Sequence, residues 1–204
     1  MSGIALFSDL HMGHHNDAPF FNSECVRFID WMLDLCKENE VEEIIFLGDF
    51  FHSRTRLRVD TMDMAVDAVR KLTEAFPVTM IVGNHDMFYR DSREVVGIEV
   101  FRPLGVNIIK DIEQVGDITF VPFLVGDEHL DLQHVTTPFV LGHLEMANFQ
   151  TSILGYMMDD AKVDPDSIQP DVQRIISGHY HHRQTSYIGS GAKVTYLGAP
   201  FAHN

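Results

Sequence analysis

Five short apolar runs in this chain are each followed at once by side chains that can bind metal ions. The runs read IALFS, EEIIFL, VTMIV, TPFVL and QRIIS, and each predicts a buried strand. Ligands of open α/β sheets bind just outside the carboxyl ends of the strands, so we expect these side chains to meet at one edge. The polar segments are Asp9-Leu10-His11, Gly48-Asp49, Gly83-Asn84-His85-Asp86, Gly142-His143 and Gly178-His179-Tyr180-His181.

Strand and helix signals alternate in the first half of the chain, which predicts parallel strands joined by helices. The expected elements there are strands over 3–8, 43–47 and 77–82 and helices over 22–38, 58–75 and 93–102. The second half is less regular, with hairpin-like pieces and a long connection over 144–170 that we expect to be functional or disordered. Its other expected elements are strands over 105–109, 112–115, 117–123, 138–141, 172–177, 184–188 and 193–198 and a short helix over 126–134.

The composition favours one domain over residues 1–204, because 45% of the residues are hydrophobic. Acidic residues outnumber basic ones by 30 to 15, so a nucleic-acid substrate would need a locally basic surface. Cys25 and Cys36 lie about three turns apart on one expected helix, and we interpret them as buried free thiols in a reducing compartment. No apolar run approaches the roughly 20 residues of a membrane span, and the first strand begins too early for a signal peptide. We therefore expect a cytoplasmic protein.

The donor atoms at the strand ends indicate a transition-metal site with more ligands than one ion needs. Mixed oxygen and nitrogen ligands suit Mn, Fe or Zn better than Mg or Ca. We expect two divalent ions, roughly 3.5–4 Å apart and bridged by Asp49, and the ligand mix does not choose among Mn²⁺, Fe²⁺ and Zn²⁺. The candidate ligands are Asp9, His11, Asp49, Asn84, His143, His179 and His181.

Three further residues are candidates for the chemistry itself. His85 follows Asn84 and should turn away from the metals, where it could protonate the leaving alkoxide. Asp86 would fix the tautomer of His85, and His52 is a second candidate for contacting the substrate phosphate. A lone histidine is more often a core or surface residue, but five motifs in this order at strand ends argue against that interpretation.

Arginines cluster after two of these segments. Arginine forks suit phosphate recognition, so these residues are candidate substrate contacts. The alternative is a solvated loop and the start of a helix. The residues are Arg54, Arg56, Arg58, Arg90 and Arg93.

The five segments resemble the D-x-H, G-D, G-N-H-D/E, G-H and G-H-x-H motifs of the calcineurin-like metallophosphoesterase superfamily. The resemblance runs from Asp9 to His181 and implies an α/β (α+β) fold: a four-layer β-sandwich flanked by helices, with a dinuclear metal site at the carboxyl ends of strands. It implies that one ion is held by Asp9, His11, Asp49 and His181, and the other by Asp49, Asn84, His143 and His179. It also gives His85 the place of the catalytic histidine.

Shorter segments are similar to SbcD-type repair nucleases and to phage recombination endonuclease subunits. These are residues 48–54 (GDFFHSR), 142–146 (GHLEM) and 196–200 (YLGAP). The resemblance implies a DNA substrate, an SMC-like coiled-coil ATPase partner, a homodimer, and a phage-encoded protein that acts in the host cytoplasm. Those nucleases continue into a DNA-capping domain and an ATPase-binding region, which we expect to be absent here.

Three functions remain open from the sequence. The first is a metal-dependent DNA phosphodiesterase, acting as a double-strand exonuclease and single-strand endonuclease in recombination and repair. The second is a phosphoesterase of the same superfamily that acts on cyclic nucleotides, nucleotides or phosphoproteins. The third is a non-catalytic binding scaffold, which the intact set of ligands disfavours.

Overall fold

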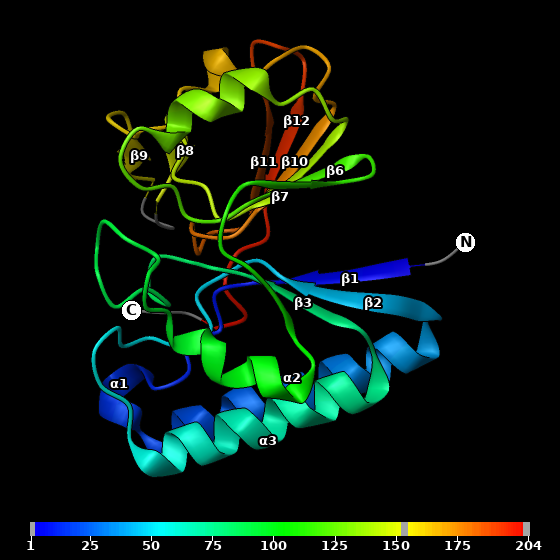
Figure 1. Ribbon diagram of the computed structural model, residues 1–204, viewed down its shortest axis with the longest axis vertical. Helices are drawn as coiled ribbons and strands as arrows, with labels where there is room; N and C mark the ends of the chain where they lie inside the picture. Colours follow the sequence, from blue (N-terminus) through cyan, green and yellow to red (C-terminus); the bar gives the residue numbers. More distant parts are fainter. Residues whose placement is uncertain (1–2, 152–154, 202–204) are drawn as a thin grey trace.

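Two β-sheets packed face to face form the centre of the molecule (Figure 1). The computed structural model describes residues 3–151 and 155–201. The first sheet has the order β1-β2-β3-β4 and is parallel throughout. Its strands are β1 (Gly3–Phe7), β2 (Val41–Phe46), β3 (Val78–Ile81) and β4 (Asn107–Ile109).

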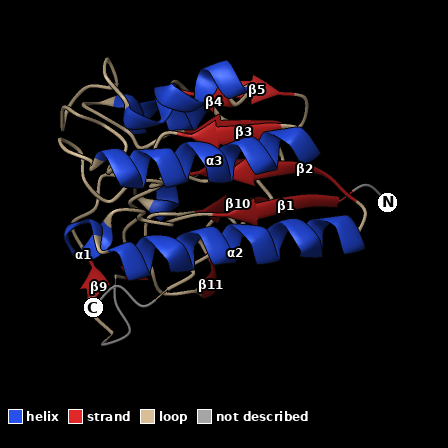
Figure 2. Cartoon of the chain, turned by 90° about the horizontal axis from the view of Figure 1, so that it is seen from below, coloured by secondary structure: helices blue, strands red, loops and turns tan. Residues whose placement is uncertain are grey.

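Helices α2 (Pro19–Glu38) and α3 (Val59–Ala75) cover the outer face of this sheet (Figure 2). Proline at the first helical position suits the start of α2, because its missing N–H would have no intrahelical partner there. The buried residues Cys25, Ile29 and Leu33 recur every four positions and give α2 an apolar stripe toward the sheet. A 3₁₀ helix, η1 (Gly97–Leu104), joins the same layer.

The second sheet is mixed, with the order β11-β12-β10-β7-β6-β5. Its four central strands are parallel, and β5 and β11 pair antiparallel at the two edges. The strands are β5 (Glu113–Val115), β6 (Ile118–Val121), β7 (Phe139–Gly142), β10 (Arg174–Ser177), β11 (Gln184–Tyr187) and β12 (Lys193–Tyr196).

The space between the two sheets is filled by apolar side chains from both of them. Ile45, Leu47 and Ile81 come from the first sheet or its strand ends, and Phe120 and Leu141 come from the second. A further core covers the outer face of the second sheet. The elements near that face are η2 (Glu128–His134), β8 (Phe149–Gln150), β9 (Met157–Met158) and η3 (Pro165–Ser167).

This arrangement confirms the expected α/β β-sandwich flanked by helices. The hairpins expected in the second half are confirmed, because β5 pairs antiparallel with β6 and β11 with β12 at the sheet edges. The segments expected as helices over 93–102 and 126–134 are 3₁₀ helices instead, and Pro103 inside η1 cannot donate the hydrogen bond that an α-helix would need. The long connection over 144–170 holds β8, β9 and η3, with residues 152–154 outside the described ranges.

Cys25 and Cys36 are buried free thiols, as expected. Within residues 3–151 and 155–201, no helix is both long and apolar enough to cross a membrane.

Candidate active site

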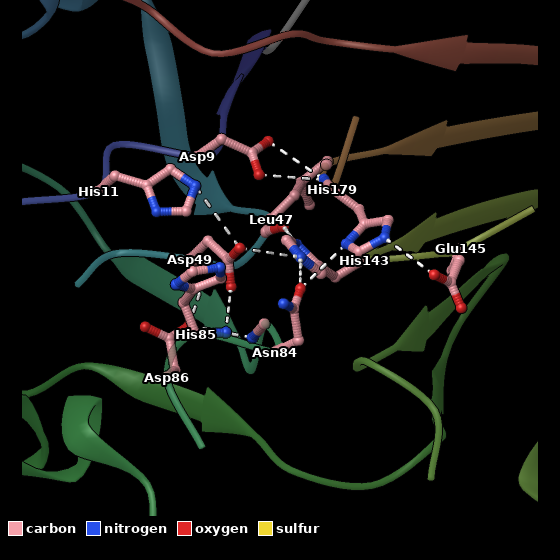
Figure 3. Close-up of polar contacts among 12 residues, drawn as sticks. Asp9, His11, Leu47, Asp49, Asn84, His85, Asp86, His143, Glu145 and His179 are labelled. Atoms are coloured by element: carbon pink, nitrogen blue, oxygen red, sulfur yellow. Dashed lines mark hydrogen bonds and ion pairs between the residues drawn. The ribbon is translucent and has the colours of Figure 1, made fainter. Parts of the chain in front are cut away.

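The polar segments that follow β1, β2, β3, β7 and β10 meet at one edge of the sandwich (Figure 3). Three of these strands belong to the first sheet and two to the second. Parallel pairing within each sheet places carboxyl ends side by side, and face-to-face packing brings the two sets together. Residues 170 positions apart in the sequence, such as His11 and His181, are therefore in contact.

Asp49 lies at the centre of this cluster and is almost completely buried. Its Oδ2 atom lies 3.6 Å from His11 Nε2 and 3.4 Å from His143 Nε2. Its Oδ1 atom accepts a 2.7 Å hydrogen bond from the backbone N–H of His85. One carboxylate thus faces ligands on both sides, which is the position that a bridging ligand between two ions requires.

The first group of donor atoms surrounds Asp9. The ligand atoms of Asp9, His11 and His181 lie within 4.8 Å of one another. The two imidazoles approach to 2.9 Å between their Nε2 atoms, and His181 Nε2 lies 3.9 Å from Asp9 Oδ1. The backbone N–H of His179 donates to both oxygens of Asp9, at 3.1 and 3.2 Å, and fixes the carboxylate.

The second group surrounds the side-chain carbonyl of Asn84. Its Oδ1 atom lies 3.0 Å from His143 Nε2 and 2.9 Å from His179 Nδ1. The Nδ1 atom of His143 lies 2.7 Å from the Leu47 carbonyl. Since a carbonyl only accepts, His143 Nδ1 carries a proton, and in the neutral ring the Nε2 lone pair faces the cluster. A lone pair directed at two oxygen acceptors is the arrangement that a cation between them would satisfy.

Charge and burial shift the ionisation of these groups in opposite directions. Burial raises the pKa of Asp9 to about 7. Burial alone would raise the pKa of Asp49 too, but His143 and His11 beside it hold that pKa well below its usual range. Burial lowers the pKa of His143, but the carboxylates of Asp49 and Asp9 outweigh it and raise the pKa to about 9. Buried carboxylates of this kind require positive charge nearby.

The donor set fits divalent cations. Buried carboxylate, amide and imidazole groups converge with their acceptor atoms facing one another, and bound cations would offset the cost of burying them. The chain therefore carries the candidate histidine and aspartate ligands of a dinuclear metal site.

Two glycines allow the loops that carry the candidate ligands to approach each other closely. A Cβ atom at Gly83 would lie 2.2 Å from Asp49 Oδ1, and one at Gly48 would lie 2.4 Å from His143 Nδ1. Glycine is needed at both positions because the loops approach each other so closely.

Several candidate ligands have left-handed backbone conformations, which are uncommon for residues other than glycine and concentrate at functional sites. They are Asp9 (φ 55°), His11 (φ 49°), Asp49 (φ 62°) and His179 (φ 89°).

His85 and His52 lie together beside the cluster. Their rings are stacked with centroids 5.4 Å apart, and the ring of His85 meets that of His11 edge-on at 4.7 Å. The Nδ1 atom of His85 lies 2.6 Å from the His52 carbonyl, so Nδ1 carries a proton there. This leaves Nε2 as the atom of His85 that can face a substrate.

The expected role of Asp86 in fixing the tautomer of His85 is corrected by the structure. The His52 carbonyl takes that role. The buried Asp86 carboxylate instead accepts hydrogen bonds from both the loop that follows β2 and the loop that follows β3. Its donors are the backbone N–H groups of Gly83, Asp49, Phe50 and Phe51, at 2.9–3.3 Å.

The five candidate arginines have different surroundings. The expectation that Arg93 contacts substrate is wrong. Its buried guanidinium donates to Glu128 at 2.5 and 2.8 Å and to the Phe123 carbonyl. Arg58 is exposed but forms a two-point ion pair with Asp60. Arg54, Arg56 and Arg58 line a hollow of about 710 Å³ beside His52 and His85, and Arg90 is close enough to Arg54 to lower its pKa, after the larger effect of burial.

Two further residues lie near the cluster. Glu145 Oε1 lies 3.8 Å from His179 Nε2, and this interaction lowers the pKa of Glu145. Its position two residues after His143 is the signal that could have identified it, by the same alternation that relates Asp9 to His11. His14 has its ring 4.2 Å from that of His52, on a turn whose unusual backbone the sequence does not predict.

Comparison with known proteins identifies relatives of this arrangement. The model of the calcineurin-like phosphoesterase family matches residues 3–183. A protein of Invertebrate iridescent virus 3 named "Putative phosphoesterase 078R" is 28% identical over 176 residues, which cover 78% of this chain and 48% of the viral protein. The chain thus spans about half the length of this curated relative.

Solved structures with the same fold include a nuclease and two phosphatases. The nuclease MPE of Pseudomonas putida has a TM-score of 0.52 and 17% identity, over 98% of this chain and 77% of that one. A dimetal phosphatase from Danio rerio has a TM-score of 0.60 and 15% identity, over 96% and 87%. Purple acid phosphatase PPD1 of yellow lupin (Lupinus luteus) has a TM-score of 0.58 and 11% identity, over 97% and 44%. At these identities the likeness concerns the fold.

Replacing Asp86 separates its observed structural role from a role in proton transfer. We expect Asp86→Ala to lower the free energy of unfolding by roughly 3 kcal/mol or more, because it leaves several buried N–H donors without an acceptor. Chemical denaturation measures this change, with the exposed Asp91→Ala as the matched control. Unchanged stability together with an altered pH profile of activity would support the tautomer role instead.

Proposed function

The chain belongs to the calcineurin-like phosphoesterase family, and from this premise we propose that it is a metal-dependent nuclease. It would hydrolyse phosphodiester bonds in DNA, as a double-strand exonuclease and single-strand endonuclease in recombination and repair. The family supports the coarser statement, an enzyme that acts on phosphoester bonds. The observation that supports DNA as the substrate is the arginine-lined hollow beside His52 and His85.

The proposed ligand sets follow the two groups of donor atoms. Asp9, His11, Asp49 and His181 would hold one ion, and Asp49 would share the other with Asn84, His143 and His179. A bound pair of ions lowers the pKa of a coordinated water and binds the oxygens of the phosphate as a Lewis acid. We propose Mn²⁺ as the native ion, with Fe²⁺ or Zn²⁺ as alternatives, since each accepts both nitrogen and oxygen ligands.

His85 is placed to act on the leaving group. Its backbone N–H is fixed by Asp49 and its Nδ1 by the His52 carbonyl, so its Nε2 atom has a defined direction. Breaking the phosphodiester bond leaves an alkoxide, and the doubly protonated ring of His85 would give it the proton on Nε2, which converts it into an alcohol. The ring of His52, stacked on that of His85, would contact the substrate phosphate.

A phosphoesterase that acts on cyclic nucleotides, nucleotides or phosphoproteins is the second candidate. The formal net charge of −15 favours it, because an acidic chain repels the DNA backbone except at locally basic sites. A non-catalytic scaffold is a weaker candidate, because the donor atoms of the cluster are complete and His85 is held in place.

The proposed partners of the nuclease are the DNA substrate, an SMC-like coiled-coil ATPase and a second copy of the chain. These proposals rest on the resemblance of residues 48–54, 142–146 and 196–200 to repair and recombination nucleases. The proposed phage or viral origin is in keeping with the viral relative, and action in the host cytoplasm is proposed with it.

A panel of substrates separates the two enzymatic candidates. We expect the manganese-loaded protein to degrade linear and single-stranded DNA, because the arginine-lined hollow gives an additional contact for a polyanion. A cyclic nucleotide, a phosphopeptide and a chromogenic phosphodiester are assayed beside the DNA. Turnover of the small esters without cleavage of DNA would reject the nuclease in favour of the second candidate.

The bridging role of Asp49 predicts that one substitution removes both ions. Asp49→Ala should lower the metal content from two ions per chain to less than one, because each proposed ligand set loses its shared carboxylate. Metal analysis after dialysis measures this, with Asp63→Ala on the exposed face of α3 as control. Two ions retained at full affinity in the Asp49 variant would refute the bridge.

The role of His85 predicts a dependence on the leaving group. His85→Ala should keep the metals but slow cleavage of DNA by about 10²–10⁴-fold, the usual contribution of a general acid. The loss should be much smaller with a nitrophenyl ester, whose leaving group departs without a proton. The exposed His134→Ala is the control, and an equal loss on both substrates would contradict proton donation by His85.

A further inference from the structure

Two hollows meet at His85. The metal-side hollow, of about 250 Å³, is lined by candidate ligands, including Asp49, Asn84 and His181. The arginine-side hollow, of about 710 Å³, is lined by His52, Arg54 and other residues of the loops that follow β1 and β2. His85 lines both hollows, so its ring lies between the metal side and the arginine side.

The charge of the arginine-side hollow differs from that of the rest of the chain. Three guanidinium groups line it against one carboxylate, Asp17, in a protein whose formal net charge is −15. Arg58 is engaged by Asp60, and Arg56 is exposed. Arg54 is half-buried, and this burial lowers its pKa, so its guanidinium has lost part of its hydration. A partly desolvated guanidinium is suited to binding a phosphate with two hydrogen bonds.

From this placement we propose that the arginine-side hollow binds the leaving half of the substrate, with Arg54 on the next phosphate of that half. The inference rests on the proposed nuclease function and specifies which part of the polynucleotide the enzyme recognises. A hollow of about 710 Å³ is within the range of small-molecule sites and can take a nucleotide.

The reaction step defines which half this is. The attacking water releases one proton to solvent as its oxygen forms a bond to phosphorus, and the bond from phosphorus to the sugar oxygen of the leaving half breaks. His85 gives its proton to that sugar oxygen, so the leaving sugar must lie next to His85. The phosphate that is attacked belongs on the metal side of His85, and the leaving sugar therefore extends to the other side, into the arginine-side hollow.

Three thymidine dinucleotides test the proposal: one without a terminal phosphate, one with a 5′-phosphate and one with a 3′-phosphate. The products show which nucleoside leaves with the sugar oxygen. We expect a terminal phosphate on that nucleoside to raise kcat/KM about tenfold or more, the usual effect of a charge-assisted contact. A phosphate on the other nucleoside should give less than about a threefold change.

The variant Arg54→Ala should reduce this tenfold ratio to within about twofold of one, and Arg54→Lys should keep part of it, because lysine retains the charge but not the fork. The ratio is measured within each variant, so a general loss of rate does not affect it. Arg70→Ala is the matched control, since Arg70 lies on α3 and pairs with Asp67.

The outcomes distinguish this inference from the proposed function. Cleavage of the dinucleotides with an unchanged ratio in Arg54→Ala, or a gain from the phosphate on the other nucleoside, overturns the inference alone. Turnover of a chromogenic diester without cleavage of any dinucleotide or DNA overturns both.

Discussion

The buried carboxylate of Asp49 is the contact on which the rest of the site depends. It lies between imidazoles that come from opposite sheets, His11 after β1 and His143 after β7. Its backbone is fixed by Asp86, and its side chain fits only because Gly83 has no Cβ atom. The two sheets must therefore pack in one register for the site to exist, and the shared apolar core between them determines that register.

Without bound cations, this arrangement lowers the folding stability of the protein. Asp9 and Asp49 are buried close to each other, and several ligands have left-handed backbone conformations. Each such conformation costs of order 1–3 kcal/mol, and the surrounding contacts must hold it. Hydrogen bonds from backbone N–H groups to both carboxylates do part of this. Bound cations would supply the remaining stabilisation of the carboxylates, so we expect metal binding to increase the stability of this edge.

The strand pattern predicted the convergence of the five segments, because apolar strands that end in Asp, Asn or His leave few places for those side chains, and the resemblance of the motifs to a known family implied the β-sandwich. It did not predict the surroundings that depend on distant residues. Arg93 follows a site loop, yet its partner Glu128 lies 35 positions away on η2. Asp86 was interpreted from its neighbour His85, but its hydrogen bonds go to backbone groups of another loop. Contacts of this kind depend on tertiary packing, which local patterns do not encode.

The position of His85 would connect the proposed metal site with the proposed substrate site. Its backbone contacts Asp49 and its ring contacts the carbonyl of His52, so the residue is held from both sides. The loop that carries His52 also carries Arg54, Arg56 and Arg58. A shift of this loop would move the ring of His85 and the arginines together relative to the candidate metal ligands. Substrate binding in the hollow would then orient the leaving sugar and His85 in one step, because a single loop supports both.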